Sequence, residues 1–181
     1  MDPSIITDLI ALSKRNDEKA FRKIVEYYQS MIYSLSFRIL CNEEDAKDLV
    51  QETFIRVWQH LSNFDMNRKF STWLYKIATN LCLDELKSSK RNLMSSSIDE
   101  TLYNFINSED IEQTIINSEL AKIINDLTNE LTPKQKIVFT LRHLEELEVD
   151  EIVEISGLSP EKIKCNLFLA RQTIRRKLEK F

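Results

Sequence analysis

The chain has 181 residues and a net charge of −4, with 43% hydrophobic and 30% charged residues, as expected for one medium or two small globular domains. One glycine and three prolines are too few for the many tight turns of a sandwich or barrel, so long helices are expected. The chain lacks an apolar run of roughly 20 residues and a basic signal peptide, so we expect a cytoplasmic protein without membrane insertion. Three scattered cysteines argue against a disulfide or metal site.

Apolar residues at helical spacing predict two helices at the start of the chain. The first covers Ser4–Ser13. The second follows a cap at Asn16-Asp17 and runs to Leu40 with a period of three to four residues.

A third helix, capped by Asn42, has two different faces. On a helical wheel one side is apolar and holds Ala46, Val50, Phe54, Val57 and Leu61. The opposite side is polar and acidic, with one apolar member, and consists of Asp48, Gln51, Glu52 and Ile55. An acidic face that carries an apolar residue is suited to docking on another protein.

A polar loop at 62–69 leads to a fourth helix, Ser71–Lys87, which buries Leu74, Ile77, Ala78 and Leu81. Its other side holds side chains that suit nucleic acid, at a spacing of i, i+4, i+7 and i+11: Asn80, Asp84, Lys87 and Arg91. Residues 68–91 carry six Lys and Arg against two carboxylates, a local charge of +4. Local charge governs contact with phosphate, so the acidic total does not exclude DNA binding.

The segment after the fourth helix changes in composition. Serine, lysine and asparagine dominate at first, which is typical of a linker. Residues 92–132 then carry one lysine against eight carboxylates, a local charge of −7. An acidic connector therefore separates two helical parts.

The last part of the chain has the pattern of a helix-turn-helix. Thr132-Pro133 begins a helix with a capping box that ends at Gln135. Gly157, the only glycine, separates two short amphipathic segments, and Ser159 caps the second of them. Residues 162–181 carry seven Lys and Arg against one carboxylate, so this last helix is suited to the major groove.

Two runs of sequence, DLVQETF at Asp48–Phe54 and FSTWLYKIATN at Phe70–Asn80, resemble region 2 of the sigma-70 family of bacterial sigma factors. The helix-turn-helix resembles region 4 of the same family and follows the region 2 runs in the expected order. A chain with only these two regions is similar to the extracytoplasmic-function (ECF) group, whose members keep only the second and fourth regions. The resemblance implies an all-α fold of two small helical domains joined by an acidic linker. We expect a region 2 helical bundle at 1–91, a linker at 92–117 and a region 4 helix-turn-helix domain at 118–181.

The resemblance also implies three functional surfaces. The −10 promoter element is expected to contact Phe64, Asn67, Arg68, Lys69, Asn80, Asp84, Lys87 and Arg91. The −35 element is expected to contact Ser159, Lys162, Lys164, Cys165, Phe168, Arg171 and Arg175. Core polymerase is expected to dock on Asp48, Gln51, Glu52 and Ile55.

The implied function is that of a promoter-specificity subunit, which binds core RNA polymerase and directs transcription initiation at promoter DNA. The sequence shows no catalytic centre, so we expect neither an enzyme nor a cofactor. Family habit adds an anti-sigma factor as a further partner to test. Leu169 departs from the family, because a basic residue is common at its position, which puts that DNA contact in doubt.

Two alternatives remain open at this point. A stand-alone helix-turn-helix regulator would explain residues 132–181 but leaves Asp48–Asn80 without a purpose. A helical adaptor that binds only protein would suit the acidic total but leaves both basic helices unexplained. Substitutions at Asn80 and Lys164, compared with substitutions at Asp48 and Glu52, discriminate between them.

Overall fold

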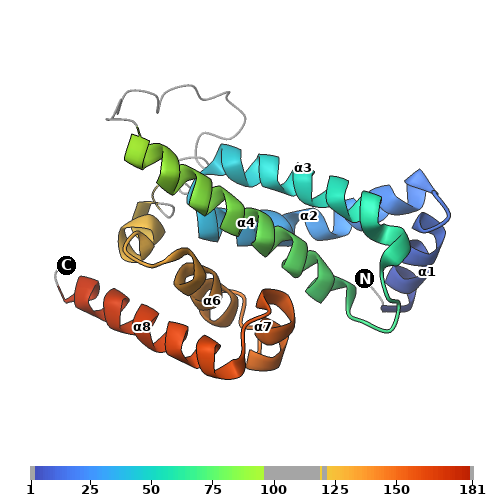
Figure 1. Cartoon of the computed structure of the whole chain (residues 1–181). Coiled ribbons are helices and arrows are strands. Elements are labelled where there is room, and N and C mark those ends of the chain that lie inside the picture. The colour runs from blue at the N-terminus through green and yellow to red at the C-terminus, as the bar shows by residue number, and fades with distance from the viewer. Residues whose placement is uncertain (1–2, 96–118, 120–121, 180–181) are drawn as a thin grey trace.

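The computed structural model describes residues 3–95, 119 and 122–179, and the elements in these ranges are helices without a strand (Figure 1). The N-terminal half contains α1 (Pro3–Ser13), α2 (Glu18–Leu40), α3 (Glu43–His60), the short 3-10 helix η1 (Leu61–Asn63) and α4 (Phe70–Ser95). The C-terminal half contains helical residues 122–128, then α6 (Pro133–His143), α7 (Val149–Ser156) and α8 (Pro160–Leu178). The all-α prediction is confirmed.

The predicted caps of α2 and α3 are confirmed. The Asp17 carboxylate accepts hydrogen bonds from the backbone N–H groups of Lys19 and Ala20, at 2.9 and 3.0 Å. The Asn42 side-chain oxygen likewise accepts from two N–H groups in the first turn of α3. Each cap satisfies donors that have no partner inside the helix, which fixes where the helix begins.

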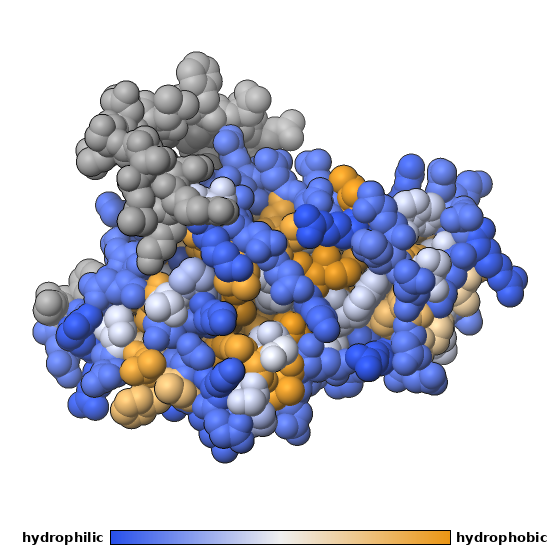
Figure 2. Space-filling view, viewed as in Figure 1, coloured by the Kyte–Doolittle hydropathy of each residue, from blue (hydrophilic) through white to orange (hydrophobic). Residues whose placement is uncertain are grey.

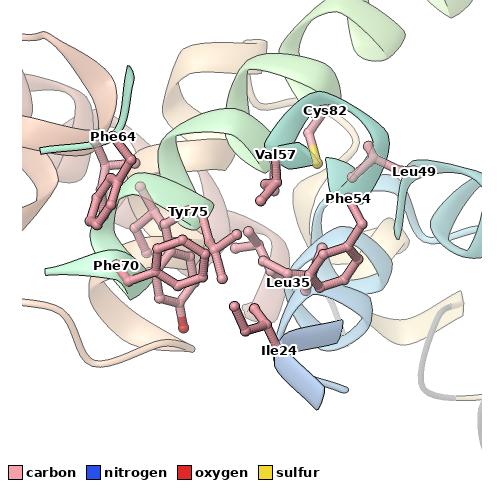
Figure 3. Packing of buried hydrophobic residues seen from close by; sticks show 14 of the residues in the cluster. Ile24, Leu35, Leu49, Phe54, Val57, Phe64, Phe70, Tyr75 and Cys82 are labelled. Atoms are coloured by element: carbon pink, nitrogen blue, oxygen red, sulfur yellow. The ribbon is translucent and has the colours of Figure 1, made fainter. Parts of the chain in front are cut away.

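The four helices of the N-terminal half surround one apolar core, seen from close by in Figure 3. The apolar face predicted for α3 lies in it, with Ala46, Phe54, Val57 and Leu61 buried and Val50 half-buried. Ile24 and Leu35 of α2 are fully buried against this face (Figure 3). The opposite face of α3 is thereby left to solvent.

Helix α4 is longer than its sequence predicted, and more of its residues are buried. It extends through Ser95, beyond the predicted end at Lys87. Leu74 and Ala78 are buried as predicted, but Thr72, Tyr75 and Thr79 are buried as well. The additional burial arises because α6 and α7 pack on a second side of α4 (Figure 1).

The C-terminal half forms the predicted helix-turn-helix. The Thr132 hydroxyl accepts from the Gln135 N–H at 3.3 Å, and the Gln135 side chain accepts from the Thr132 N–H at 3.0 Å. Gly157 ends α7 in the left-handed region, at φ 67°, where its N–H donates to the Val153 carbonyl. The chain then turns into α8, so that α7 and α8 pack on each other.

The two halves share one continuous apolar core. Ile137 and Val138 of α6 and Ile152 of α7 belong to the same cluster as Leu74 and Tyr75 of α4. The division into domains at 1–91, 92–117 and 118–181 stays a prediction, and residues 96–117 of the expected linker lie outside the described residues.

Candidate nucleic-acid interface

The polar face of α3 is open to solvent. Asp48, Gln51 and Ile55 are exposed, and Glu52 is half-buried. Glu52 Oε1 accepts from Arg56 Nε at 2.8 Å, one turn further along the helix. The Ile55 side chain is 50% exposed beside these carboxylates, so this face combines negative charge with an uncovered apolar residue.

The loop between α3 and α4 is held by hydrogen bonds at its base. Lys14 Nζ donates to the Phe64 carbonyl at 2.8 Å, which ties the loop to the end of α1. Asp65 Oδ1 accepts from both the backbone N–H and the side-chain Nδ2 of Asn67, each at 3.0 Å. These bonds, the backbone one first, lower the pKa of Asp65. The resulting turn leaves Asn67, Arg68 and Lys69 exposed.

Phe64 lies in the core of the free protein, and its contact with DNA stays a prediction. It is 5% exposed, and its ring centroid lies 5.2 Å from that of Phe70 and 5.0 Å from that of Trp73. Phe64 and Phe70 are labelled in Figure 3. An aromatic ring contributes most of its energy through such burial, so Phe64 supports the loop from below.

The outer face of α4 presents the predicted polar side chains. Asn80, Asp84 and Lys87 are exposed, and the Lys87 Nζ lies 3.5 Å from the Asp84 carboxylate. Arg91 belongs to the same helix, but its side chain lies outside the described residues. With the loop, this face forms a surface that we call the α4 surface: Asn67, Arg68, Lys69, Asn80, Asp84 and Lys87.

Helix α8 carries a second basic surface, and its predicted members are all exposed. This α8 surface consists of Ser159, Lys162, Lys164, Cys165, Phe168, Arg171 and Arg175. The Ser159 hydroxyl accepts from the Lys162 N–H at 3.4 Å and so caps the helix. The Phe168 side chain is 66% exposed.

Arg171 of the α8 surface is oriented by a histidine of its own half. Its Nε donates to His143 Nε2 at 3.2 Å, which requires that nitrogen to be unprotonated. Burial, followed by the charges of Arg171 and Arg142, lowers the pKa of His143. The neutral imidazole therefore persists at pH 7 and can accept this bond.

The structure also brings together residues that the sequence did not single out. Glu145, at the end of α6, accepts from Arg38 of α2 at 2.7 Å and from the Tyr75 hydroxyl of α4 at 2.9 Å. Arg38 also donates to the Leu144 carbonyl at 2.6 Å. Figure 2 shows apolar side chains between α4 and the C-terminal helices. A lone glutamate in an acidic stretch gives no signal for such a role.

Other types of site are not found in the part of the chain that the structure describes. No group of three or more His, Cys, Asp or Glu side chains there is arranged to hold a metal ion. Cys41, Cys82 and Cys165 are free thiols. None of the described helices has the length and apolar character needed to cross a membrane.

Comparison with known proteins gives two family matches and relatives of full length. Residues 24–92 match the model for sigma-70 region 2, and residues 121–174 match the model for sigma-70 region 4. The ECF RNA polymerase sigma factor SigW of Bacillus subtilis is 34% identical over 172 residues, which cover 91% of this chain and 92% of that protein. The ECF RNA polymerase sigma-E factor of Haemophilus influenzae is 30% identical over 178 residues, which cover 94% of this chain and 94% of that protein.

One solved structure agrees with these matches at the level of the fold. It shows CnrH in complex with the cytosolic domain of CnrY, and the superposition has a TM-score of 0.70 at 22% identity. It covers 97% of this chain and 98% of that chain.

Proposed function

The chain belongs to the ECF RNA polymerase sigma factors of the sigma-70 family, and on this basis we propose that it is a promoter-specificity subunit of bacterial RNA polymerase. The observation that carries the proposal is the similarity to named ECF sigma factors along nearly the whole chain. The protein directs transcription initiation by binding, and it contributes no catalytic group of its own.

The exposed face of α3 is the proposed docking site for core polymerase. Asp48, Gln51 and Glu52 offer acceptors for basic side chains of the partner, and the exposed Ile55 adds apolar contact. Charged pairs of this kind guide the encounter, whereas an apolar residue buried in the interface contributes to residence time.

The α4 surface is the proposed site for the −10 element. The amide of Asn80 can both donate to and accept from a base edge. Arg68, Lys69 and Lys87 supply positive charge for the phosphates on either side. Extruding a base costs a few kcal/mol of stacking, which a fitted protein surface offsets.

The α8 surface is the proposed site for the −35 element. Helix α8 follows the turn at Gly157, as a recognition helix follows the turn of a helix-turn-helix. Lys162, Lys164 and Arg175 supply phosphate contacts, and the exposed ring of Phe168 offers an apolar surface to a thymine methyl group. Either surface alone binds DNA weakly, but polymerase presents both to one promoter, which raises their combined affinity.

The test mixes the purified chain with sigma-free core polymerase and maps transcription starts on genomic DNA fragments. Discrete starts that share two upstream motifs are expected, and Asp48→Arg should abolish them. Asp8→Arg is the matched control, because Asp8 is an exposed aspartate on α1, away from the docking face. If the wild-type chain neither binds core polymerase nor produces starts, the proposal fails, and DNA binding by the helix-turn-helix becomes the next question.

A further inference from the structure

Helix α8 carries several cations, and Arg171 differs from two of them in the group that it contacts. Arg175 lies 3.3 Å from the Glu179 carboxylate, and Arg176 also pairs with a carboxylate. Arg171 Nε donates instead to Nε2 of the neutral His143, at 3.2 Å. No ion pair of Arg171 is found in the described part of the chain, so its positive charge stays available to an outside anion.

The bond to His143 uses one donor of the Arg171 guanidinium and leaves the others. An arginine has five N–H donors, so the two Nη groups keep four of them. The Nη groups can donate side by side to a phosphate, or to O6 and N7 of guanine. Because the guanidinium is planar, an acceptor at Nε restrains the orientation of both Nη groups.

His143 is itself restrained by its own helix. The Phe139 ring, one turn earlier on α6, lies 4.8 Å from the imidazole, centroid to centroid, and Phe139 is half-buried. Helices α6 and α8 pack on each other, so the acceptor stands on a neighbouring helix rather than on α8 itself. This arrangement orients Arg171 before DNA binds, which lowers the cost of ordering a long side chain in an interface.

The charges near His143 favour its neutral form. Burial first, and then the cations Arg171 and Arg142, lower the pKa of His143. A protonated imidazole donates from both nitrogens, so acidification below this pKa removes the acceptor and places two cations in contact. The other charged or titratable side chains at this end of α6 are bonded elsewhere: Arg38 of α2 and Tyr75 of α4 to Glu145, and Glu148, which caps α7, to Arg142.

We propose that His143 is a positioning residue of the α8 surface: its unprotonated Nε2 holds the Arg171 guanidinium in orientation for DNA and leaves its charge intact. The inference rests on the proposed function of the α8 surface. A carboxylate at position 143 would also hold the arginine, but it would compete with phosphate for the same cation. A neutral acceptor avoids this competition, and protonation of His143 releases Arg171.

The first measurement needs no DNA. Solution NMR of the full chain follows the Nε–H signal of Arg171, identified by its absence in R171Q, and the ring protons of His143, identified by their absence in H143L. As the pH is lowered, the Arg171 signal should shift with the same midpoint as the His143 ring. In H143L the Arg171 signal should show no such step.

The second measurement is a double-mutant cycle on DNA affinity. Fluorescence anisotropy with a duplex DNA pool of randomised sequence compares the wild type, H143L, R171Q and H143L/R171Q at low ionic strength, where phosphate contacts contribute most. The cycle isolates the coupling between the two residues, because a general charge effect of His143 is the same with and without Arg171. H60L is the matched control, since His60 is the other histidine of the chain and is exposed on α3.

At neutral pH, H143L should weaken binding about three- to tenfold in the wild-type background, because Arg171 must then be ordered on binding. In the R171Q background the same substitution should change the affinity by less than about twofold. Below the midpoint at which His143 takes up its proton, this coupling should disappear. H60L should bind as the wild type does at neutral pH.

The proposal is overturned if H143L has no effect in the wild-type background, or an equal effect in both, since His143 would then act without Arg171. A coupling that persists once His143 is protonated also overturns it, as does an Arg171 signal that does not follow the His143 titration. Failure of the proposed function looks different: R171Q would bind the pool as tightly as the wild type, which removes Arg171 from DNA binding and the inference with it.

Discussion

The Glu145 carboxylate accepts a hydrogen bond from the Arg38 guanidinium at 2.7 Å, although 107 positions separate the two residues in the chain. The other carboxylate oxygen accepts from the Tyr75 hydroxyl. One side chain of the C-terminal half thus joins α2 and α4 of the N-terminal half. This carboxylate is largely buried, and it is the acceptor of the Tyr75 hydroxyl, whereas Arg38 also donates to the Leu144 carbonyl.

Replacing this carboxylate should destabilise the protein. Glu145→Gln replaces one of the two acceptor oxygens by an NH2 group and removes the negative charge beside Arg38, and we expect the free energy of unfolding to fall by about 1–3 kcal/mol. Urea denaturation measures the change. Glu146→Gln, at the exposed neighbouring position, should change it by less than about 0.5 kcal/mol. Equal effects of the two variants would contradict the role assigned to Glu145.

Tyr75 should make stability depend on alkaline pH. Burial, followed by the negative charge of Glu145, raises the pKa of Tyr75 above its ordinary value of 10.0. The unfolded chain therefore loses this proton first as the pH rises. The stabilising contribution of Tyr75 is complete below pH 10 and declines above it.

Tyr75→Phe isolates this effect from that of other titrating groups. The stability difference between the wild type and Tyr75→Phe should shrink between pH 9 and 11, values chosen to lie about one unit either side of an ordinary tyrosine pKa. Urea denaturation across this range measures the difference. Parallel stability curves would show that the tyrosine titrates as it does in the unfolded chain.

Phe64 should matter for stability through its packing. Phe64→Ala removes a ring that is buried against Phe70 and Trp73, which should lower the free energy of unfolding by about 3–5 kcal/mol. Met66→Ala, in the same loop but 38% exposed, is the control and should have a small effect. A small effect of Phe64→Ala as well would mean that the ring is not part of the core in solution.

Ile55 should be needed for polymerase binding but not for folding. Ile55→Asp should weaken binding to core polymerase by at least about tenfold, because it puts a charge where the proposed interface buries an apolar side chain. Ile5→Asp is the matched control, since Ile5 is 49% exposed on α1 and Ile55 is 50% exposed on α3. Surface plasmon resonance compares them, and equal affinities would place docking elsewhere.

A side chain at Gly157 should meet no steric clash, but the backbone conformation of this residue should disfavour it. Apart from the two neighbouring residues in the chain, no atom lies within 4 Å of where a Cβ would stand, yet φ is +67°. Gly157→Ala should therefore cost about 1 kcal/mol of stability from the backbone alone, and Gly157→Asn less, because asparagine accepts this region more readily. Thermal denaturation ranks the three chains, and an unchanged alanine variant would indicate that the turn relaxes.

Local features of this protein were predictable from its sequence. The caps at Asp17, Asn42 and Thr132 each act on N–H groups no more than three residues away, so a short stretch contains both partners. The apolar face of α3 follows from helical periodicity, which needs only the repeat of the residues themselves. The helix-turn-helix at Gly157 is equally local.

The tertiary structure alone decided how the second side of α4 is used. The apolar repeat of α4 does not predict that Tyr75 is buried. Its hydroxyl donates to Glu145, which lies 70 positions away in the sequence. The pairs of Lys69 with Glu151 and Arg68 with Glu154 likewise join residues of opposite charge that would be expected to face solvent in isolation. Sequence periodicity determines which face of a helix is apolar, whereas the partner of a polar face depends on which distant helix packs beside it.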